Sequence, residues 1–285
     1  MNELQRMQKK ELNNPNLPHT NSGIILSPTD NDAKKAQMFN QCIEQFSCAL
    51  CQFYQFCKVS SVELKSKDIA AKRLQQTRLI EKRTHLYQQN DICQALYIVT
   101  SGSFKSYSTQ ALGRNRITGF HFLGEIMGLG GMSGEGFDTS AKALEDSTVC
   151  EFPLAEIERI SLEFPQLKFY LLKAMSQEMI KYKAMLTFLG NCTAHEKVAR
   201  FLLELSHRVY SSNSHGMSDR NTQNSANFSL PMTYADLGNY LGLTVETVSR
   251  VMSYLREQNV LSIKNKKIEI SDKQKLQELI RPLHS

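Results

Sequence analysis

The segment MTYADLGNYLGLTVETVSRVMSYLREQNVLSIKNKKIEI, residues 232–270, carries the most specific structural signal in the chain. Thr233, with Asp236 three residues later, has the pattern of a capping box and predicts the start of a helix. Gly242 predicts the end of that helix, and Thr244 predicts the cap of a second one. The closing SIKNKKIEI alternates between apolar and polar residues, which is typical of a β-hairpin. The segment therefore predicts a helix-turn-helix followed by a wing.

The second of these helices has an apolar face and a polar face. The apolar residues recur at spacings of 3, 4 and 3: Val245, Val248, Met252 and Leu255. The polar residues gather toward its N-terminal half: Glu246, Ser249, Arg250 and Ser253. A helix that reads the major groove of DNA needs this layout. An arginine can bridge O6 and N7 of guanine and a carboxylate can accept from N4 of cytosine, so Arg250 and Glu246 suit a site with a G·C pair.

A solvated helix face is the alternative interpretation of these polar residues. The complete helix-turn-helix arrangement favours DNA reading over that alternative. Lys264, Lys266 and Lys267 at the predicted turn of the wing suit contacts with phosphates. The net charge of +6 is compatible with a polyanionic partner but does not by itself indicate one.

The chain as a whole divides into four parts. Residues 1–40 are polar without hydrophobic periodicity, which predicts a flexible tail. Residues 41–165 hold a cysteine-rich segment and then short β-rich runs separated by glycines, which predicts a small β-roll. A long helix is expected over 166–190. The C-terminal domain over 191–285 begins with a second amphipathic helix and a polar loop at 211–228.

The long helix, which Pro165 opens, carries an apolar stripe along its whole length. Its members alternate at spacings of 3 and 4: Leu172, Met175, Met179, Tyr182, Leu186 and Leu189. This is the a/d pattern with which two helices pair. Packing of one core helix on its own domain is the alternative, but the strict alternation favours a partner helix and predicts a homodimer.

The cluster CALCQFYQFC holds Cys48, Cys51 and Cys57 in a chain of seven cysteines. No apolar run reaches the roughly 18 residues that span a bilayer, and the N-terminus lacks the apolar core of a signal peptide, so we expect a cytoplasmic protein with no membrane partner. Thiols stay reduced there, which favours metal or redox chemistry over a disulfide framework. The residues alone leave an iron-sulfur centre, a structural zinc site, a redox pair and three small hydrophobes open. A cysteine-based redox enzyme is a further possibility, but no nucleophile-base pair stands out in the sequence.

The stretch GNYLGLTVETVSR, residues 238–250, resembles the recognition segment of the CRP/FNR superfamily of bacterial transcription regulators, and specifically its FNR branch of oxygen-responsive fumarate and nitrate reduction regulators. The resemblance covers residues 42–280. It implies an α+β fold: an N-terminal β-roll (a double-stranded β-helix like that of cyclic-nucleotide-binding domains) that acts as the sensor domain over 41–165, a long dimerisation helix and a C-terminal winged helix-turn-helix. It also implies a regulator that is not an enzyme.

The same resemblance implies partners and ligands. Bases would be read by Glu246, Ser249 and Arg250, in double-stranded DNA that carries a palindrome of TTGAT-type half-sites, with RNA polymerase as a further partner in the control of anaerobic genes. A 4Fe-4S cluster would be held by four cysteines: Cys48, Cys51, Cys57 and Cys150. Oxygen would dismantle that cluster and shift the balance between monomer and dimer. A structural zinc or a thiol redox sensor at these cysteines is the alternative.

A cyclic nucleotide is not expected as a ligand. In the family's nucleotide sites an arginine that pairs with the cyclic phosphate follows the Gly-Glu pair, which is Gly124 and Glu125 here. This chain has Asp138 and Thr139 where the arginine would stand, and an acidic residue repels a phosphodiester.

Two further expectations concern single residues. FNR proteins tend to carry an acidic residue on the dimer helix where this chain has Tyr182, so we expect the cluster-free protein to dimerise more readily than a typical FNR. Cys93 and Cys192 are isolated and are interpreted as small apolar residues, whereas the role of Cys42 stays open.

Overall fold

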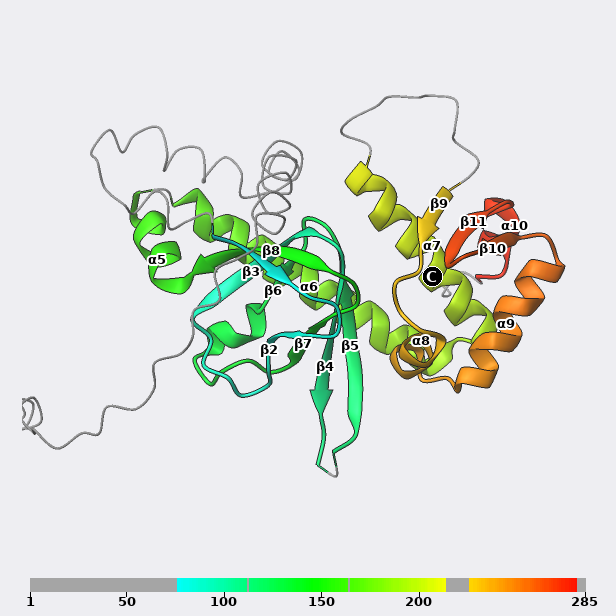
Figure 1. The fold of residues 1–285 in the computed structure, drawn as a ribbon, viewed down its shortest axis with the longest axis horizontal. Helices are drawn as coiled ribbons and strands as arrows, with labels where there is room; N and C mark the ends of the chain where they lie inside the picture. Colours follow the sequence, from blue (N-terminus) through cyan, green and yellow to red (C-terminus); the bar gives the residue numbers. More distant parts are fainter. Residues whose placement is uncertain (1–75, 112, 164, 214–225, 281–285) are drawn as a thin grey trace, which may run out of the picture. The chain divides into compact units, whose positions relative to one another are not determined.

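A computed structural model of the chain describes residues 76–111, 113–163, 165–213 and 226–280. The predicted tail at 1–40 and the cysteine segment at 48–57 lie outside the described residues. The described part consists of a β-roll, helices that follow it, and a C-terminal winged helix-turn-helix (Figure 1). The predicted α+β fold class is therefore confirmed.

The β-roll is built from two antiparallel sheets of four strands, in the orders β1-β8-β3-β6 and β2-β7-β4-β5. A short 3₁₀ turn, Leu129–Ser133, follows β6. The strands are β1 (Gln76–Ile80), β2 (His85–Tyr87), β3 (Ala95–Ser101), β4 (Phe104–Thr109), β5 (Asn115–His121), β6 (Ile126–Met127), β7 (Ser140–Ala143) and β8 (Ser147–Pro153).

Strand β3 shows why the roll needs a helical cover. Side chains alternate between the two faces of a strand. On one face Ala95, Tyr97 and Val99 enter the core between the sheets. On the other face Leu96 and Ile98 join a second apolar cluster, which the following helices complete. The strand is therefore apolar along nearly its whole length instead of alternating.

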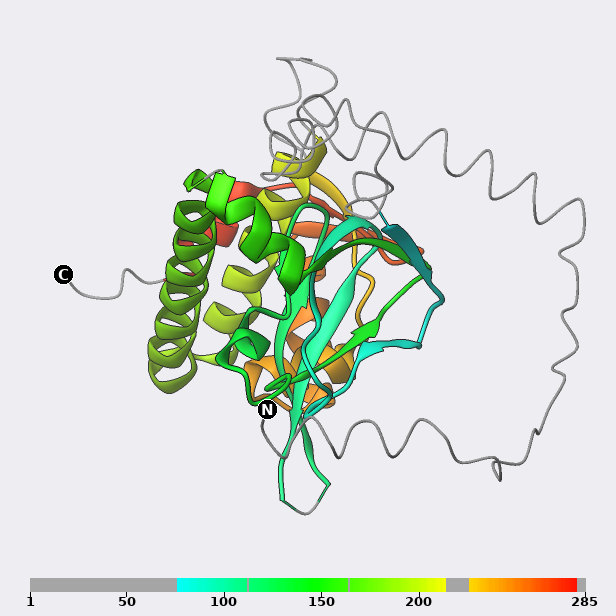
Figure 2. The same ribbon diagram turned by 90° about the vertical axis from the view of Figure 1, so that its left-hand side faces the viewer.

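Two helices supply that cover: α5 (Leu154–Glu163) and α6 (Gln166–Asn191). Ile157 and Ile160 of α5 and Leu167 and Leu171 of α6 are buried in the second cluster. Figure 2 shows α6 as a long helix along one side of the roll. The start of α6 directly after Pro165 confirms the sequence prediction, whereas α5 was not predicted.

The C-terminal part begins with α7 (Ala194–Asn213), which packs against the helix-turn-helix in one apolar core. After β9 (Ala226–Ser229) come the helices α8 (Tyr234–Leu241) and α9 (Val245–Glu257), the wing strands β10 (Leu261–Lys264) and β11 (Lys267–Ile270), and α10 (Lys273–Glu278). None of the described helices has the length and apolarity to cross a membrane.

The polar loop predicted at 211–228 is wrong at both ends. Helix α7 continues to Asn213, and Ala226–Ser229 forms a strand that pairs with β11. Phe228 explains the strand, because its side chain is buried in the C-terminal core while the backbone of β11 offers a free edge on that side. The wing is therefore a sheet of three strands in the order β10-β11-β9, and not a hairpin alone.

Candidate nucleic-acid interface

The caps of the helix-turn-helix are those that the sequence predicts. The Thr233 hydroxyl accepts from the Asp236 amide, and the Asp236 carboxylate accepts from the Thr233 amide, which completes a capping box. Gly242 ends α8 at a φ of 68°, in the left-handed region that favours glycine. Thr244 caps α9 by accepting from the Thr247 amide. These local contacts fix the turn between the two helices.

Helix α9 buries one side and exposes the other. Val248, Met252 and Leu255 are buried as predicted. Val245 was expected to join them, but 44% of its surface is exposed, whereas Val251 is only 3% exposed. At 3.6 residues per turn, the row through Val248 and Val251 lies on the core side, and the first residue of the helix lies beyond the edge of that core.

Glu246, Ser249 and Arg250 are all exposed on α9. Hydrogen bonds from its own backbone amide and from Thr244 lower the pKa of Glu246, with a smaller contribution from the charge of Arg250. The carboxylate is therefore ionised at neutral pH and acts only as an acceptor, as the amino group of cytosine requires. The N-terminal half of α9 thus presents an acceptor, a hydroxyl and a guanidinium on one open surface.

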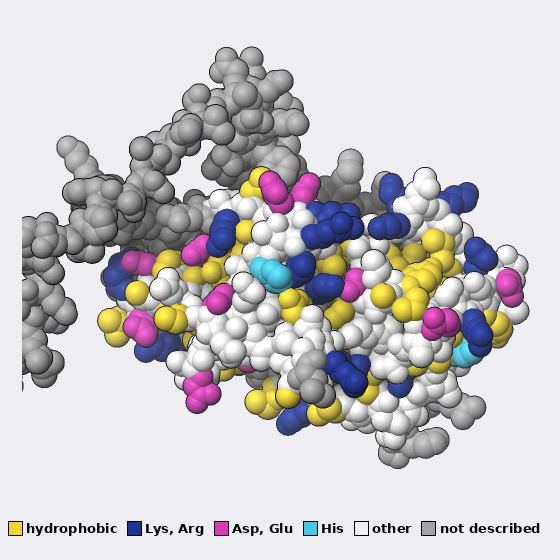
Figure 3. All heavy atoms as spheres, turned by 60° about the horizontal axis from the view of Figure 1, so that its bottom comes forward, with side chains coloured by type: hydrophobic (Ala, Val, Ile, Leu, Met, Phe, Trp, Pro, Cys, Tyr) yellow, Lys and Arg dark blue, Asp and Glu magenta, His cyan; other side chains and the backbone are white. Residues whose placement is uncertain are grey.

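The wing turn lies between β10 and β11. Asn265 and Lys266 have positive φ values of 50° and 64°, as in the tight hairpin turns that match the twist of antiparallel strands. Lys264, Lys266 and Lys267 are all exposed around this turn. On the face drawn in Figure 3, lysine and arginine side chains are spread among acidic ones. The exposed lysines of the wing turn are therefore available for contacts with phosphates.

Cys150 is the described member of the predicted cluster ligands; Cys48, Cys51 and Cys57 lie outside the described residues. It lies in β8, opposite Thr77 of β1 and Ile98 of β3. Its side chain is half-buried at the edge of the apolar cluster under α5 and α6. A half-buried thiol on a rigid central strand suits a ligand that must be both accessible and fixed. Within the described ranges no three His, Cys, Asp or Glu side chains form a group that could hold a metal ion.

The isolated cysteines lie at the margins of the apolar cores. Cys93 packs against the core of the roll and Cys192 against the C-terminal core, both half-buried. Burial raises the pKa of the Cys93 thiol, which makes it a poor nucleophile. Both positions agree with the interpretation of these residues as small apolar side chains.

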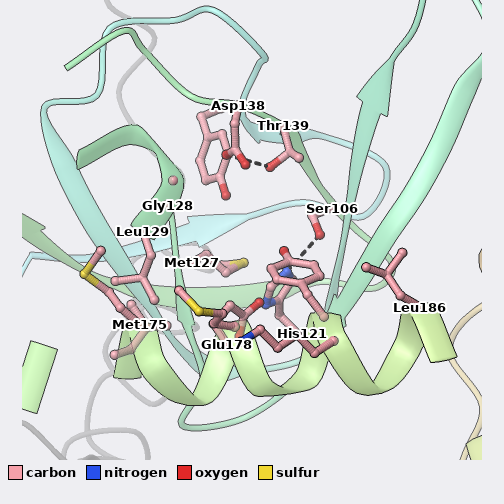
Figure 4. Close-up of a pocket in the computed structure, with 16 residues that line it drawn as sticks. Ser106, His121, Met127, Gly128, Leu129, Asp138, Thr139, Met175, Glu178 and Leu186 are labelled. Carbon is pink, nitrogen blue, oxygen red and sulfur yellow. Dashed lines mark hydrogen bonds between the residues drawn. The ribbon is translucent and has the colours of Figure 1, made fainter. Parts of the chain in front are cut away.

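A cavity of about 330 Å³ lies between the roll and α6 (Figure 4). Asp138 and Thr139 face it from the roll, Glu178 faces it from α6, and His121 donates to or accepts from Ser106 at 3.0 Å beside it. Lys183 is the one lysine or arginine among the described residues that line this cavity. No arginine is therefore available within its described walls to form a bidentate pair with a phosphate.

Glu125 does not line that cavity. Its carboxylate accepts two hydrogen bonds from Arg208 of α7, from Nε at 2.8 Å and from Nη2 at 2.6 Å. Burial alone would raise the pKa of Glu125, but the charge and hydrogen bonds of Arg208 outweigh it and lower that pKa. The Glu125 carboxylate thus forms an ion pair with the C-terminal part of the chain. The sequence alone does not indicate this contact.

The predicted dimer seam lies largely open on the single chain. Its first five members are exposed: Leu172, Met175, Met179, Tyr182 and Leu186. The sixth, Leu189, is half-buried and packs against the C-terminal core. Phe169 and Ile180, which the heptad pattern does not include, are also 70% and 63% exposed. This amount of apolar surface on one helix is typical of a surface that a partner covers.

Comparison with known proteins gives consistent matches for both halves of the chain. Residues 77–163 match the model of the cyclic nucleotide-binding domain, and residues 196–279 match that of the Crp-like helix-turn-helix domain. The transcriptional activator protein Anr of Pseudomonas protegens is 35% identical over 229 residues, which cover 80% of this chain and 90% of that protein. The fumarate and nitrate reduction regulatory protein of Escherichia coli is 32% identical over 232 residues, covering 81% of this chain and 89% of that protein. The solved structure of FixK2 from Bradyrhizobium japonicum superimposes with a TM-score of 0.65 at 28% identity, covering 74% of this chain and 99% of that chain.

Proposed function

Because the chain belongs to the CRP/FNR family of transcription regulators, we propose that it is an oxygen-responsive iron-sulfur regulator that binds palindromic FNR-type DNA as a homodimer and controls anaerobic genes. It is a regulator and not an enzyme. The observation that carries the DNA-binding part is the open surface of α9, where Glu246, Ser249 and Arg250 stand together above a buried apolar side.

The base-reading role of Arg250 is tested by its replacement with alanine. A bidentate contact between arginine and guanine contributes about 1–3 kcal/mol of discrimination. A homodimer loses one such contact at each half-site, so Arg250→Ala should weaken binding to a TTGAT-type palindrome by about 2–6 kcal/mol, roughly 30-fold or more. The loss should shrink when the guanine of each half-site is replaced, since the arginine contact is specific to that base. Fluorescence anisotropy with both DNAs measures this.

Arg256 provides the matched control, because it is an exposed arginine in the last turn of the same helix. Arg256→Ala also removes one positive charge, but at a position outside the N-terminal half of α9 that is proposed to read bases. Equal losses for the two variants, or an equal loss of Arg250→Ala on both DNAs, would reduce the role of Arg250 to general electrostatics and refute base reading.

The sensing part of the proposal rests on Cys150 and on the three cysteines of the N-terminal segment. A 4Fe-4S cluster bound by these four thiolates would supply the oxygen-sensitive chemistry. The described chain would contribute the Cys150 thiol on β8, through which a bound cluster would connect the N-terminal segment to the roll. The alternative with structural zinc uses the same thiolates.

Anaerobic purification followed by absorption spectra before and after exposure to air separates these possibilities. A brown protein that bleaches in air supports the cluster, whereas a colourless protein with one bound zinc refutes it. Cys150→Ser should abolish the colour, while Cys192→Ser, the half-buried cysteine of the C-terminal core, should retain it.

We further propose that the exposed seam of α6 pairs two copies of the chain, so that each copy reads one half-site, that RNA polymerase is a partner at the promoter, and that no cyclic nucleotide binds. The last point is supported by the carboxylates of Asp138 and Glu178 at the cavity and by the engagement of Glu125 with Arg208. Isothermal titration with cyclic AMP tests it, and binding at micromolar concentration would overturn it.

A further inference from the structure

Asn239, in the last turn of α8, is hydrogen-bonded to the backbone of the β-roll through both the oxygen and the nitrogen of its side-chain amide. Its Oδ1 accepts from the Ile117 amide at 2.7 Å, and its Nδ2 donates to the Asn115 carbonyl at 2.8 Å. Both backbone groups belong to β5, the last strand of its sheet. An edge strand presents unpaired N–H and C=O groups, and Asn239 satisfies one of each, as a neighbouring strand would.

Further contacts surround this attachment. Lys105 of β4 donates to the carboxylate of Asp236 at 2.5 Å, so the same side chain that caps α8 also binds the roll. Arg116 of β5 donates to the Tyr240 carbonyl at 3.3 Å. The ring of Tyr240 meets that of Phe120 edge-on, with the centroids 5.1 Å apart. Helix α8 is therefore held on the β4–β5 hairpin both in its first turn and in its last turn.

The position of α8 determines that of α9. Leu237 and Leu241 of α8 are buried in one core with Val248 and Leu255 of α9, and the turn between the helices is a single glycine-capped connection. Close packing of this kind makes the two helices move as one body. The hairpin therefore holds the reading helix through α8.

The attachment leaves the reading surface free. None of the groups that bind α8 to the hairpin belongs to α9, and Glu246, Ser249 and Arg250 are exposed while the contacts of Asn239 are made. The attachment is thus compatible with DNA binding. The attachment restricts rotation of the helix-turn-helix relative to the roll. The entropy of that rotation is therefore not lost when the protein binds DNA.

We propose that Asn239 is a positioning residue for DNA reading: by holding α8 on β5, it sets the separation of the two α9 helices in the dimer and thereby selects the spacing of the half-sites. This inference rests on the proposed function, since it requires a dimer that reads a palindrome. The two half-sites of such a dimer lie about one helical turn of DNA, roughly 34 Å, apart. One extra base pair moves a half-site by about 3.4 Å and rotates it by about 35°, which a rigidly held α9 cannot follow.

The test uses the full-length protein and a series of palindromes whose spacers differ by one base pair in each direction. Asn239→Ala removes both bonds to β5. We expect wild-type protein to prefer one spacer by about tenfold or more, and Asn239→Ala to lower that preference to about threefold. The slope of log affinity against log salt should not change, because the phosphate contacts are the same. A role of Asn239 in stability alone would weaken binding to all spacers equally.

Asn227→Ala is the matched control, because Asn227 is an exposed asparagine in β9 of the same C-terminal part and lies away from the hairpin. It should keep the wild-type spacer preference. Hydrogen exchange at the Ile117 amide is a second measurement, and it needs no DNA. The exchange rate should rise in Asn239→Ala and stay unchanged in Asn227→Ala.

An unchanged spacer preference in Asn239→Ala, or an unchanged exchange rate at Ile117, would overturn the inference while leaving the proposed function intact. Wild-type protein that binds no palindrome under cluster-retaining, anaerobic conditions would instead refute the proposed function, and the role of Asn239 with it.

Discussion

The ion pair between Arg208 of α7 and Glu125 of the roll is the polar contact whose loss we expect to cost the most stability. Arg208 donates two hydrogen bonds to the Glu125 carboxylate and a third, from Nη2 at 2.5 Å, to the Phe120 carbonyl. Its guanidinium also lies 4.7 Å from the centre of the Phe122 ring. Arg208→Met keeps most of the alkyl stem and removes the charge and all of these donors.

The size of the effect follows from burial. Breaking a fully buried ion pair on one side costs about 3–5 kcal/mol, because the remaining charge stays desolvated. Here 30% of the Arg208 side chain and 22% of the Glu125 side chain are exposed, so water partly solvates the orphaned carboxylate. We therefore expect Arg208→Met to lower the free energy of unfolding by about 2–3 kcal/mol at neutral pH, including about 1 kcal/mol for the unsatisfied Phe120 carbonyl.

The pH dependence gives a second test of the same contact. In the wild-type protein the pKa of Glu125 is lowered, so its contribution is present above the unfolded-state pKa near 4.5 and is lost as the pH falls through the folded-state value. Without Arg208, burial dominates and raises the pKa of Glu125. As the pH falls, protonation of Glu125 then removes the cost of burying an unpaired carboxylate in the variant. The difference between the two proteins should therefore be largest near pH 7 and shrink toward about pH 5.

Urea unfolding followed by circular dichroism at both pH values measures this, with Arg200→Met as the matched control on the same helix. Arg200 pairs with Glu204 at 3.2 Å, and 60% of the Glu204 side chain is exposed, so the control should lose less than about 1 kcal/mol with little pH dependence. Adding Glu125→Gln to Arg208→Met should recover part of the loss. Equal losses in the two single variants, or a difference from wild type that grows on acidification, would refute the assignment of Arg208 and Glu125 as a stabilising buried pair.

Two further predictions concern the wing and the seam. Lys266→Ala should reduce the slope of log affinity against log salt by about 0.9 for each phosphate that the variant no longer binds, without changing base preference; an unchanged slope in a salt titration would exclude Lys266 from the interface. At the seam, Tyr182 is exposed on one side only, and its partial burial together with the neighbouring Glu178 raises its pKa, so its phenol stays neutral at physiological pH. We expect the cluster-free protein to sediment as a dimer at micromolar concentration and Tyr182→Asp to sediment as a monomer, whereas a wild-type monomer would contradict the expectation for Tyr182.

The helix-turn-helix was predictable because its signals are local. Thr233, Asp236, Gly242 and Thr244 act within one or two turns of the chain, and each has the cap geometry that its residue type requires. The periodicity of apolar residues also identified the buried side of α9. It could not show which residues at the border of that side are buried. The misassignment of Val245 shows this limit, because only the surrounding core determines how far the apolar surface reaches around a helix.

The elements that were missed depend on partners far away in the sequence. Strand β9 is short and lies next to a polar segment, and it is a strand because β11 offers an edge and the C-terminal core accepts Phe228. Helix α5 follows β8 without a break and is held by Ile157 and Ile160 against the outer face of β3. Neither partner is visible in a local window of sequence.

The polar contacts between the roll and the C-terminal part carry no sequence signal at all. Lys105 and Asp236 are 131 residues apart, Ile117 and Asn239 are 122 apart, and Glu125 and Arg208 are 83 apart. Nothing in the sequence around these residues indicates their distant partners. The predicted reader was therefore correct in its fold, while the way in which it is held could only come from the structure.

Helix α6 connects these observations. Its inner side is buried near the two ends, through Leu167 and Leu171 in the cluster of the roll and through Phe188 in the C-terminal core. Between them the helix borders the cavity, and Met175, Met179, Tyr182 and Leu186 of the predicted seam line that cavity while remaining exposed. Its middle is less packed than its ends, and it is there that the proposed pairing with a second copy would act. Because the ends of α6 are anchored in both halves of the chain, a change in its middle would reach the roll and the reader together, and Asn239 would restrict how the reader moves.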